Sequence, residues 1–189
     1  MSDRPGEEVS EHERQYQDGT DPKVLDLIRI PFLQTKPKPY QPKNRLIDGD
    51  AYWEKIGQVS PSQVKALVDQ PTLLWTNDQS TMAGLNDRVE LTEASKLKLG
   101  SLYLIEVPNL ELRVFAPGAD FGNPKRRVQS RFTLHEISYH LWVTDPGVER
   151  EYLLRPDGNY RLGRHFVTVS LGEPKDGFCY KLIAAMMSA

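Results

Sequence analysis

RRVQSRFTLHEISYHLWVTD, residues 126–145, is the stretch that decides how the C-terminal half of the chain folds. Alternate side chains of a β-strand point to opposite faces of a sheet. In the first half of the stretch, one alternating set is mostly apolar, whereas the other is cationic and polar and consists of Arg127, Gln129, Arg131 and Thr133. The pattern predicts a strand with one buried face and one cationic face.

A two-residue turn at His135-Glu136 folds this stretch into a hairpin with a consistent register. Apolar residues then meet on one face, where Phe132 pairs with Tyr139, Ser130 with Leu141 and Val128 with Val143. The opposite face pairs Arg131 with His140, Gln129 with Trp142 and Arg127 with Thr144. Matching of this kind is what a half-buried hairpin requires. The turn itself lacks the preferred Asn-Gly or Asp-Gly pair.

Guanidinium groups around an exposed aromatic ring are typical of platforms for single-stranded nucleic acid. The charges follow the phosphates and the ring stacks a base. We therefore expect Arg127, Arg131 and Trp142 to contact single-stranded DNA or RNA, assisted by Lys125, Arg126, Gln129 and His140. The alternative is that this face only contacts water, while another segment covers Trp142.

Composition limits the possible functions. The chain has 189 residues and a net charge of −2, so binding of a polyanion must come from a local patch. It has a single cysteine, Cys179, which cannot form an internal disulfide and so indicates a reducing compartment. Cys179 lies in an apolar run, which indicates that its side chain packs in the core. We find no signal peptide and no apolar run long enough to span a bilayer, so we expect a cytoplasmic protein without membrane contact.

The N-terminal half mixes several element types. Residues 1–22 lack periodicity and are expected to form a flexible arm, and residues 34–44 form a proline-rich extended loop. We expect strands at 24–33 and 71–77, and helical turns at 51–57. Helices are expected at 60–70, where Ser60 and Gln63 suit a capping box, and at 91–99.

From residue 101 onward the pattern is that of β-structure. A tight turn at Pro108-Asn109 is expected to join the strands SLYLIEV and LELRVFA. Residues 144–151 look like a turn, and the segments HFVTVSL and FCYKLIAA are further strands separated by GEPKDG. About six strands at hairpin spacing suggest a small sandwich or barrel.

Catalytic chemistry has no clear signature in this sequence. We find no glycine-rich phosphate loop, nucleophile elbow or HExxH motif. His135 and His140 lack carboxylate or thiolate neighbours at matching positions, so no metal site is expected. We expect a non-enzymatic protein that uses no cofactor.

Several segments together resemble the prokaryotic dual OB-containing domain family. They include IRIPFL, KPKPYQPKN, YWEKIG, LLWTND, LNDRV, FGNPKRRVQSRF, LWVTDP, YRLG, SLGEP and GFCYKLIAA, from about residue 20 to the C-terminus. The resemblance implies two consecutive OB-type barrels, which commonly bind oligonucleotides on one sheet face. It also implies a link with prokaryotic defence or genome-conflict systems. Family members begin with a further strand region, so we expect the first barrel here to be incomplete.

These observations combine into one prediction. The protein is expected to be mainly β with short α-helical insertions: an arm at 1–22, a partial OB-like region at 23–99 and a complete OB-like barrel at 100–189. The favoured function is non-catalytic nucleic-acid binding. One alternative is an adaptor that pairs with a protein partner, or with a second copy, through an open barrel edge. A third is an enzyme with an unrecognised site.

Overall fold

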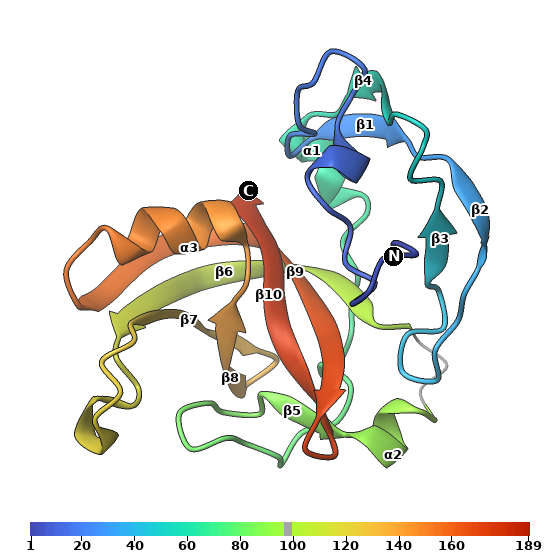
Figure 1. Ribbon diagram of the computed structural model, residues 1–189. Coiled ribbons are helices and arrows are strands. Elements are labelled where there is room, and N and C mark those ends of the chain that lie inside the picture. Colours follow the sequence, from blue (N-terminus) through green and yellow to red (C-terminus); the bar gives the residue numbers. More distant parts are fainter. Residues whose placement is uncertain (97–99) are drawn as a thin grey trace.

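The computed structural model describes residues 1–96 and 100–189 (Figure 1). A closed five-stranded barrel forms the C-terminal part. Its strands are β6 (Leu102–Phe115), β7 (Arg127–Leu134), β8 (Ile137–Val143), β9 (Gly158–Lys175) and β10 (Phe178–Ser188). They follow the order β9-β6-β7-β8-β10, and pairing between β10 and β9 closes the barrel. The β8–β10 pair is parallel, and the other pairs in the barrel are antiparallel.

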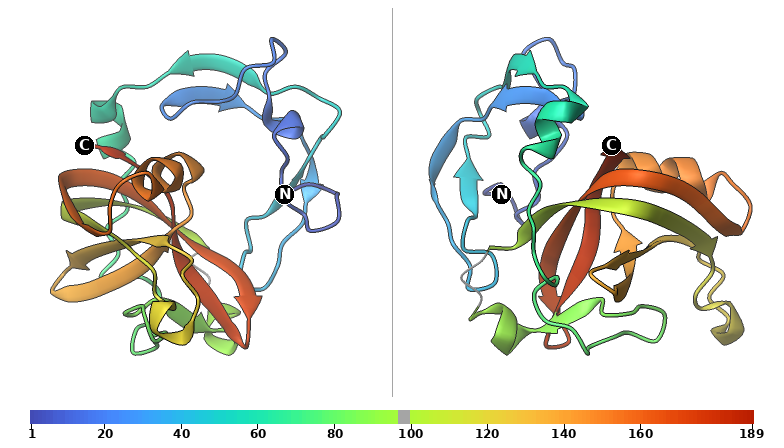
Figure 2. Two further views of the ribbon diagram at one scale, coloured as in Figure 1. Left: turned by 60° about the vertical axis from the view of Figure 1, so that its left-hand side comes forward. Right: turned by 180° about the vertical axis from the view of Figure 1, so that it is seen from behind.

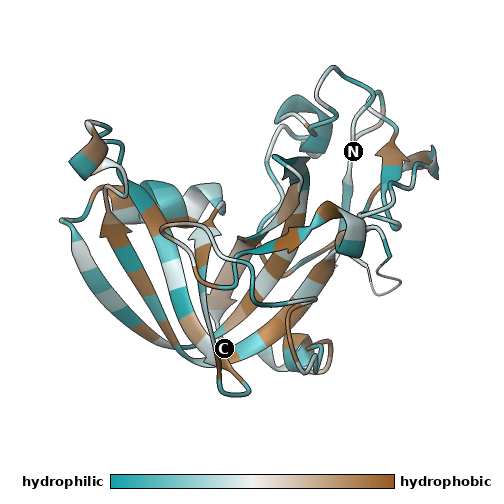
Figure 3. Ribbon diagram, turned by 90° about the horizontal axis from the view of Figure 1, so that it is seen from below, coloured by the Kyte–Doolittle hydropathy of each residue, from teal (hydrophilic) through white to brown (hydrophobic). Residues whose placement is uncertain are grey.

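Every second side chain along the barrel strands points inward, and these side chains fill the barrel interior. Bands of apolar and polar residues succeed one another along its strands (Figure 3). On β7 the inward residues include Val128 and Phe132, and on β8 they include Tyr139 and Leu141, all of them buried. Cys179 is also fully buried in this core, where burial raises the pKa of its thiol to about 11. The mainly β fold class expected from the sequence is confirmed.

The β7–β8 hairpin has the register predicted from the sequence. Phe132 lies opposite Tyr139, and Arg131 lies opposite His140. The two turn residues, His135 and Glu136, have φ angles of 46° and 69°. Both therefore occupy the left-handed region that a two-residue hairpin turn of type I′ requires.

Strand β6 corrects the prediction of a tight turn at Pro108-Asn109. The strand continues through these residues, and its register against β9 shifts between Val107 and Leu110. Proline has no N–H to give to a ladder, and a bulge is one of the few places in a sheet that tolerates it. The irregularity lets one long strand curve around the barrel instead of reversing.

Helix α3 (Pro146–Leu153) replaces the turn predicted at 144–151. The carboxylate of Asp145 accepts hydrogen bonds from the backbone N–H groups of Gly147 (3.0 Å) and Val148 (3.2 Å). Pro146 occupies the first turn, where its missing N–H costs nothing. Buried Tyr152 anchors the helix to the barrel core.

The N-terminal half lies beside the barrel in two small sheets (Figure 2). One pairs β1 (Asp26–Arg29) with β4 (Glu54–Gln58), and the other pairs β2 (Phe32–Thr35) with β3 (Arg45–Ile47). The strand predicted at 24–33 is interrupted at Pro31, and the helical turns predicted at 51–57 are wrong because β4 forms there. Pairing with β1 outweighs the weak helical propensity of this short segment.

Residues 1–22 are held by specific contacts rather than extending as an arm. They include a short 3₁₀ helix, η1 (His12–Arg14). The Ser2 hydroxyl donates to the carboxylate of Glu13 (2.5 Å), and Ile47 N–H donates to the Met1 carbonyl (3.0 Å). Lys38 pairs with both Glu7 (2.5 Å) and Glu173 (2.9 Å), so the first residues, the proline-rich loop and the barrel are linked.

The segment between the two halves carries three short elements. Helix α1 (Pro61–Lys65) has the predicted capping box of Ser60 and Gln63 but ends before residue 70. Strand β5 (Arg88–Glu90) pairs with β10, and α2 (Leu91–Ala94) follows it. The remainder of the helix predicted at 91–99 includes residues 97–99, which lie outside the described residues. The strand predicted at 71–77 is wrong, because that segment is a loop.

No helix in the described parts of the chain is both long and apolar enough to cross a bilayer.

Candidate nucleic-acid interface

The outer face of the barrel at β6, β7 and β8 brings together most of the residues predicted to bind nucleic acid. On this face Arg131 lies between Glu111 and His140, and Gln129 lies between Arg113 and Trp142. Phe115 of β6 is opposite Arg127. We call this surface the outer face; its members are Glu111, Arg113, Phe115, Arg127, Gln129, Arg131, Thr133, Ser138, His140 and Trp142.

Trp142 corrects the prediction of an exposed stacking platform. Its side chain is only 8% exposed. The Phe115 ring stacks on the indole with centroids 5.9 Å apart, and the Arg127 guanidinium lies 4.1 Å from the indole ring centre. Phe115 and the cation–π contact with Arg127 thus cover the indole ring, so Trp142 is not free to stack on a base.

Gln129 is likewise buried, because a neighbouring segment crosses the outer face above it. Its side-chain N–H donates to the Ala83 carbonyl (2.6 Å), and its side-chain oxygen accepts from Nε of Arg131 (3.2 Å). We call residues 76–87 the strap. The backbone of Leu85 exchanges two hydrogen bonds with His140 (3.1 and 3.3 Å), so the strap also pairs with the edge of β8.

The strap is fastened at both ends. At its start, the side-chain nitrogen of Lys181 donates to the Thr76 carbonyl (2.6 Å) and to Oδ1 of Asn77 (3.1 Å). At its end, the Asp87 carbonyl accepts from the backbone N–H of Lys181 (2.8 Å), and the buried Asp87 carboxylate closes the strap on itself by accepting from the N–H (2.7 Å) and hydroxyl (2.5 Å) of Thr81. Burial lowers the pKa of Lys181 to about 7, although the nearby carboxylates of Asp87 and Asp78 oppose this effect.

The arginines of the outer face lie near the carboxylates of Glu111 and Glu149 but do not pair with them. Within residues 1–96 and 100–189, none of Arg113, Arg127 and Arg131 forms a salt bridge. Burial lowers the pKa of Arg131, and the charge of Arg113 lowers it further. The pKa of His140 is lowered by burial and then by Arg131 and Arg113. Arg113 and Arg131 therefore repel each other, the Glu111 carboxylate opposes this effect, and an anionic ligand would relieve the repulsion further.

The two remaining predicted residues lie outside this cluster. Arg126 holds the end of α3, because its guanidinium donates to Asp157 (2.6 Å) and to the carbonyls of Leu153 (2.8 Å) and Arg155 (2.5 Å). Its contacts are structural. Lys125 is exposed at the end of the loop that joins β6 to β7, where it extends the cationic surface next to Arg127.

Two hollows lie on either side of Gln129 along the outer face. The first, of about 350 Å³, is lined by Glu111, Arg131, Ser138 and His140, among others. The second, of about 420 Å³, is lined by Met82, Pro117, Gly118, Asn123, Lys125, Arg127 and Glu149. Sequence reasoning missed Arg113 and Phe115, because nothing in the hairpin stretch shows which strand pairs with its other side. It also missed Met82 of the strap.

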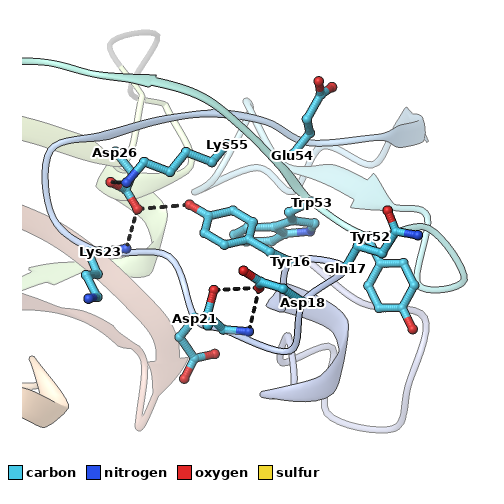
Figure 4. A pocket seen from close by; sticks show the side chains of 11 residues that line it. Tyr16, Gln17, Asp18, Asp21, Lys23, Asp26, Tyr52, Trp53, Glu54 and Lys55 are labelled. Carbon is cyan, nitrogen blue, oxygen red and sulfur yellow. Dashed lines mark hydrogen bonds and ion pairs between the residues drawn. The ribbon is translucent and has the colours of Figure 1, made fainter.

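A third pocket, of about 690 Å³, lies in the N-terminal half between residues 16–26 and 52–55 (Figure 4). Within it, Asp26 accepts a hydrogen bond from the Tyr16 hydroxyl (3.0 Å) and pairs with Lys55 (2.5 Å). Its carboxylates outnumber its lysines, since Asp18, Asp21, Asp26 and Glu54 accompany only Lys23 and Lys55. Phosphate groups would be repelled there, so the outer face is the better candidate for nucleic acid.

The topology defines the class of protein. A five-stranded barrel of this kind, with a helix between its third and fourth strands, is an OB-type fold, which binds oligonucleotides or oligosaccharides on the face of its second and third strands. Those strands are β7 and β8 here. The chain belongs to the dual OB-containing domain family, whose model matches residues 1–186. No curated protein and no solved structure matches the chain.

Proposed function

We propose that this protein binds single-stranded DNA or RNA on the outer face and catalyses no reaction on it. The observation that carries the proposal is the placement of Arg113 and Arg131 beside His140 on the outer face, where neither arginine forms a salt bridge within the described residues. Like charges held together cost free energy in the free protein. A phosphate backbone repays that cost, which is the usual source of affinity for single strands.

The position of the cluster supports the same function. It lies on β6, β7 and β8, and the β7–β8 part is the face that OB-type barrels use for oligonucleotides. The loop between β6 and β7 adds an aromatic side chain, since Phe121 of the 3₁₀ helix η2 (Ala119–Phe121) is 75% exposed. Phe121 thus takes the base-stacking role that the covered Trp142 cannot fulfil. As the family resemblance implies, we place this activity in a prokaryotic defence or genome-conflict system, and we expect it in the cytoplasm, as the sequence pattern suggested.

Salt dependence provides the test. We expect fluorescence anisotropy to show binding of labelled single strands at 50 mM salt that weakens steeply as salt rises. If Arg113 and Arg131 each neutralise one phosphate, Arg113→Ala/Arg131→Ala should reduce the slope of log affinity against log salt by about 1.4. The matched control is Arg29→Ala/Lys65→Ala, which removes the same charge from the N-terminal half.

Three outcomes would count against the proposal. They are an absence of binding to any single strand at low salt, an equal loss in the control variant, and an unchanged salt slope in Arg113→Ala/Arg131→Ala. Circular dichroism of each variant checks that its barrel is folded, so that a loss of binding can be assigned to the missing charges.

Exposed apolar side chains of the N-terminal sheets favour a second candidate, a protein-interaction role. Leu27 and Ile56 on β1 and β4 are 48% and 46% exposed, and Phe32 and Leu33 on β2 are 47% and 61% exposed. In the described part of the chain each of these sheets has two strands, so its outer edges can pair with a strand from another chain. Size-exclusion chromatography with light scattering, compared between the wild type and Leu33→Asp, tests self-association through this surface.

A further inference from the structure

Met82 is a large apolar side chain that the fold holds out in solvent beside the outer face. It is 80% exposed. The residues on both sides of it are fixed: Thr81 is bound to the Asp87 carboxylate, and the Ala83 carbonyl accepts from Gln129. Gly84 completes this tight loop, because a Cβ there would lie only 1.9 Å from Oδ2 of Asp87. The strap therefore presents Met82 in a defined position.

The hollow of about 420 Å³ next to Met82 combines two kinds of surface. Met82 and Pro117 give it apolar walls, whereas Lys125 and Arg127 give it positive charge. The Arg127 guanidinium is held in place by its contact with the Trp142 ring, 4.1 Å away. A volume of this size lies within the range of pockets that bind small molecules.

One nucleotide unit matches this combination of surfaces. A base is a flat, mostly apolar group that gains from contact with the polarizable sulfur of methionine, and its phosphate is an anion that suits Lys125 and Arg127. Asn123 supplies a polar group at the same hollow, and the single carboxylate there, that of Glu149, leaves the two cations in excess. A base within a duplex is stacked on both faces, so only an unpaired strand can present it there.

Building on the proposed function, we propose that this hollow accepts one base of the bound strand, with Met82 and Pro117 as its apolar walls and Lys125 and Arg127 on the adjoining phosphates. The strap separates this base from the part of the strand that lies on the hollow at Arg131 and His140. Met82 is thus a contact to the base, and Arg127 is a contact to the backbone.

Oligonucleotides with and without bases separate the two contacts. The probes are a fluorescently labelled eight-nucleotide dT strand and an abasic strand of the same length, titrated at 50 mM salt. Because binding to the hollow requires a base, Met82→Ala should weaken binding of the dT strand about two- to tenfold and leave the abasic strand unchanged. Arg127→Ala should weaken both. The matched control is Leu67→Ala, which removes a 68% exposed apolar side chain from the N-terminal half.

The two strands distinguish loss of the Met82 contact from a failure of the protein to bind single strands at all. If Met82→Ala weakens both strands equally, or neither, the base does not contact Met82 and the inference is overturned, while salt-dependent binding by the wild type still stands. If the wild type binds neither strand at 50 mM salt, the proposed function fails and the inference fails with it. A loss confined to the dT strand supports both.

Discussion

Lys181 gives the sharpest test of how the strap is held, through the pH dependence of stability. Its side chain is fully buried and donates to Thr76 and Asn77, and burial lowers its pKa to about 7 from the ordinary 10.5. Below pH 7 the lysine is charged in both the folded and the unfolded chain. Above pH 10.5 it is neutral in both. Between these values only the unfolded chain holds the proton, so each rise in pH favours the folded state.

The size of the effect follows from this window. Each pH unit between 7 and 10.5 adds roughly 1.4 kcal/mol to the free energy of unfolding. The full gain is therefore roughly 4–5 kcal/mol, which is a large share of the stability of an ordinary domain. Replacing the lysine by methionine removes this dependence. It also leaves two strap acceptors without a donor, which costs about 1–3 kcal/mol at every pH.

Urea denaturation of the wild type and Lys181→Met, at pH values from 6 to 10, measures the effect. The quantity to follow is the difference between the two free energies of unfolding, because other titrating groups cancel in it. Cys179 is one such group, since its buried thiol has a pKa of about 11 and acts in the opposite direction. We expect the difference to move in favour of the wild type as pH rises above 7. A difference that is flat from pH 6 to 10 would refute a neutral, buried Lys181.

Three further variants test local features of the fold. Asp145→Ala should lower the free energy of unfolding by about 1 kcal/mol in chemical denaturation, because α3 loses its N-terminal cap. His135→Asn/Glu136→Gly should raise the melting temperature, since both turn residues have positive φ. The pKa of Glu13 is lowered to about 2, chiefly by the Ser2 hydroxyl. Glu13→Gln should therefore lower stability at pH 7, with the loss fading as the pH falls from 4.5 to 2 in acid titrations followed by circular dichroism.

The sequence was most informative where a short-range pattern determines the structure. Period-two alternation over residues 127–134 and 137–143 was enough to predict the β7–β8 hairpin and its register, since a shift of one residue would reverse both faces. The capping box at Ser60 followed from local chemistry in the same way. Helix α3 was missed, although Asp145 followed by Pro146 is a helix start signal, because its sequence also suits a turn.

The candidate site was harder to predict, because long-range pairing determines what is exposed. Alternation placed Gln129 and Trp142 on the cationic face correctly. It could not show that Ala83, far away in the sequence, covers Gln129, or that Phe115 covers Trp142. The pairing of Arg113 with Gln129 was equally invisible, because the partner of β7 on its far side is set by barrel topology.

The placement of β10 as the last strand of the barrel to be made has a consequence for synthesis of the chain. Lys181 and its strap partner Thr76 are 105 residues apart, and β10 also pairs with β5, β8 and β9. A ribosome that adds about 5–20 residues per second needs roughly 5–20 s to span that interval. During this time the apolar side chains of Leu74, Trp75 and Val89, which end up buried, have no barrel to pack against. The nascent barrel thus stays open to chaperones, or to aggregation, until β10 emerges.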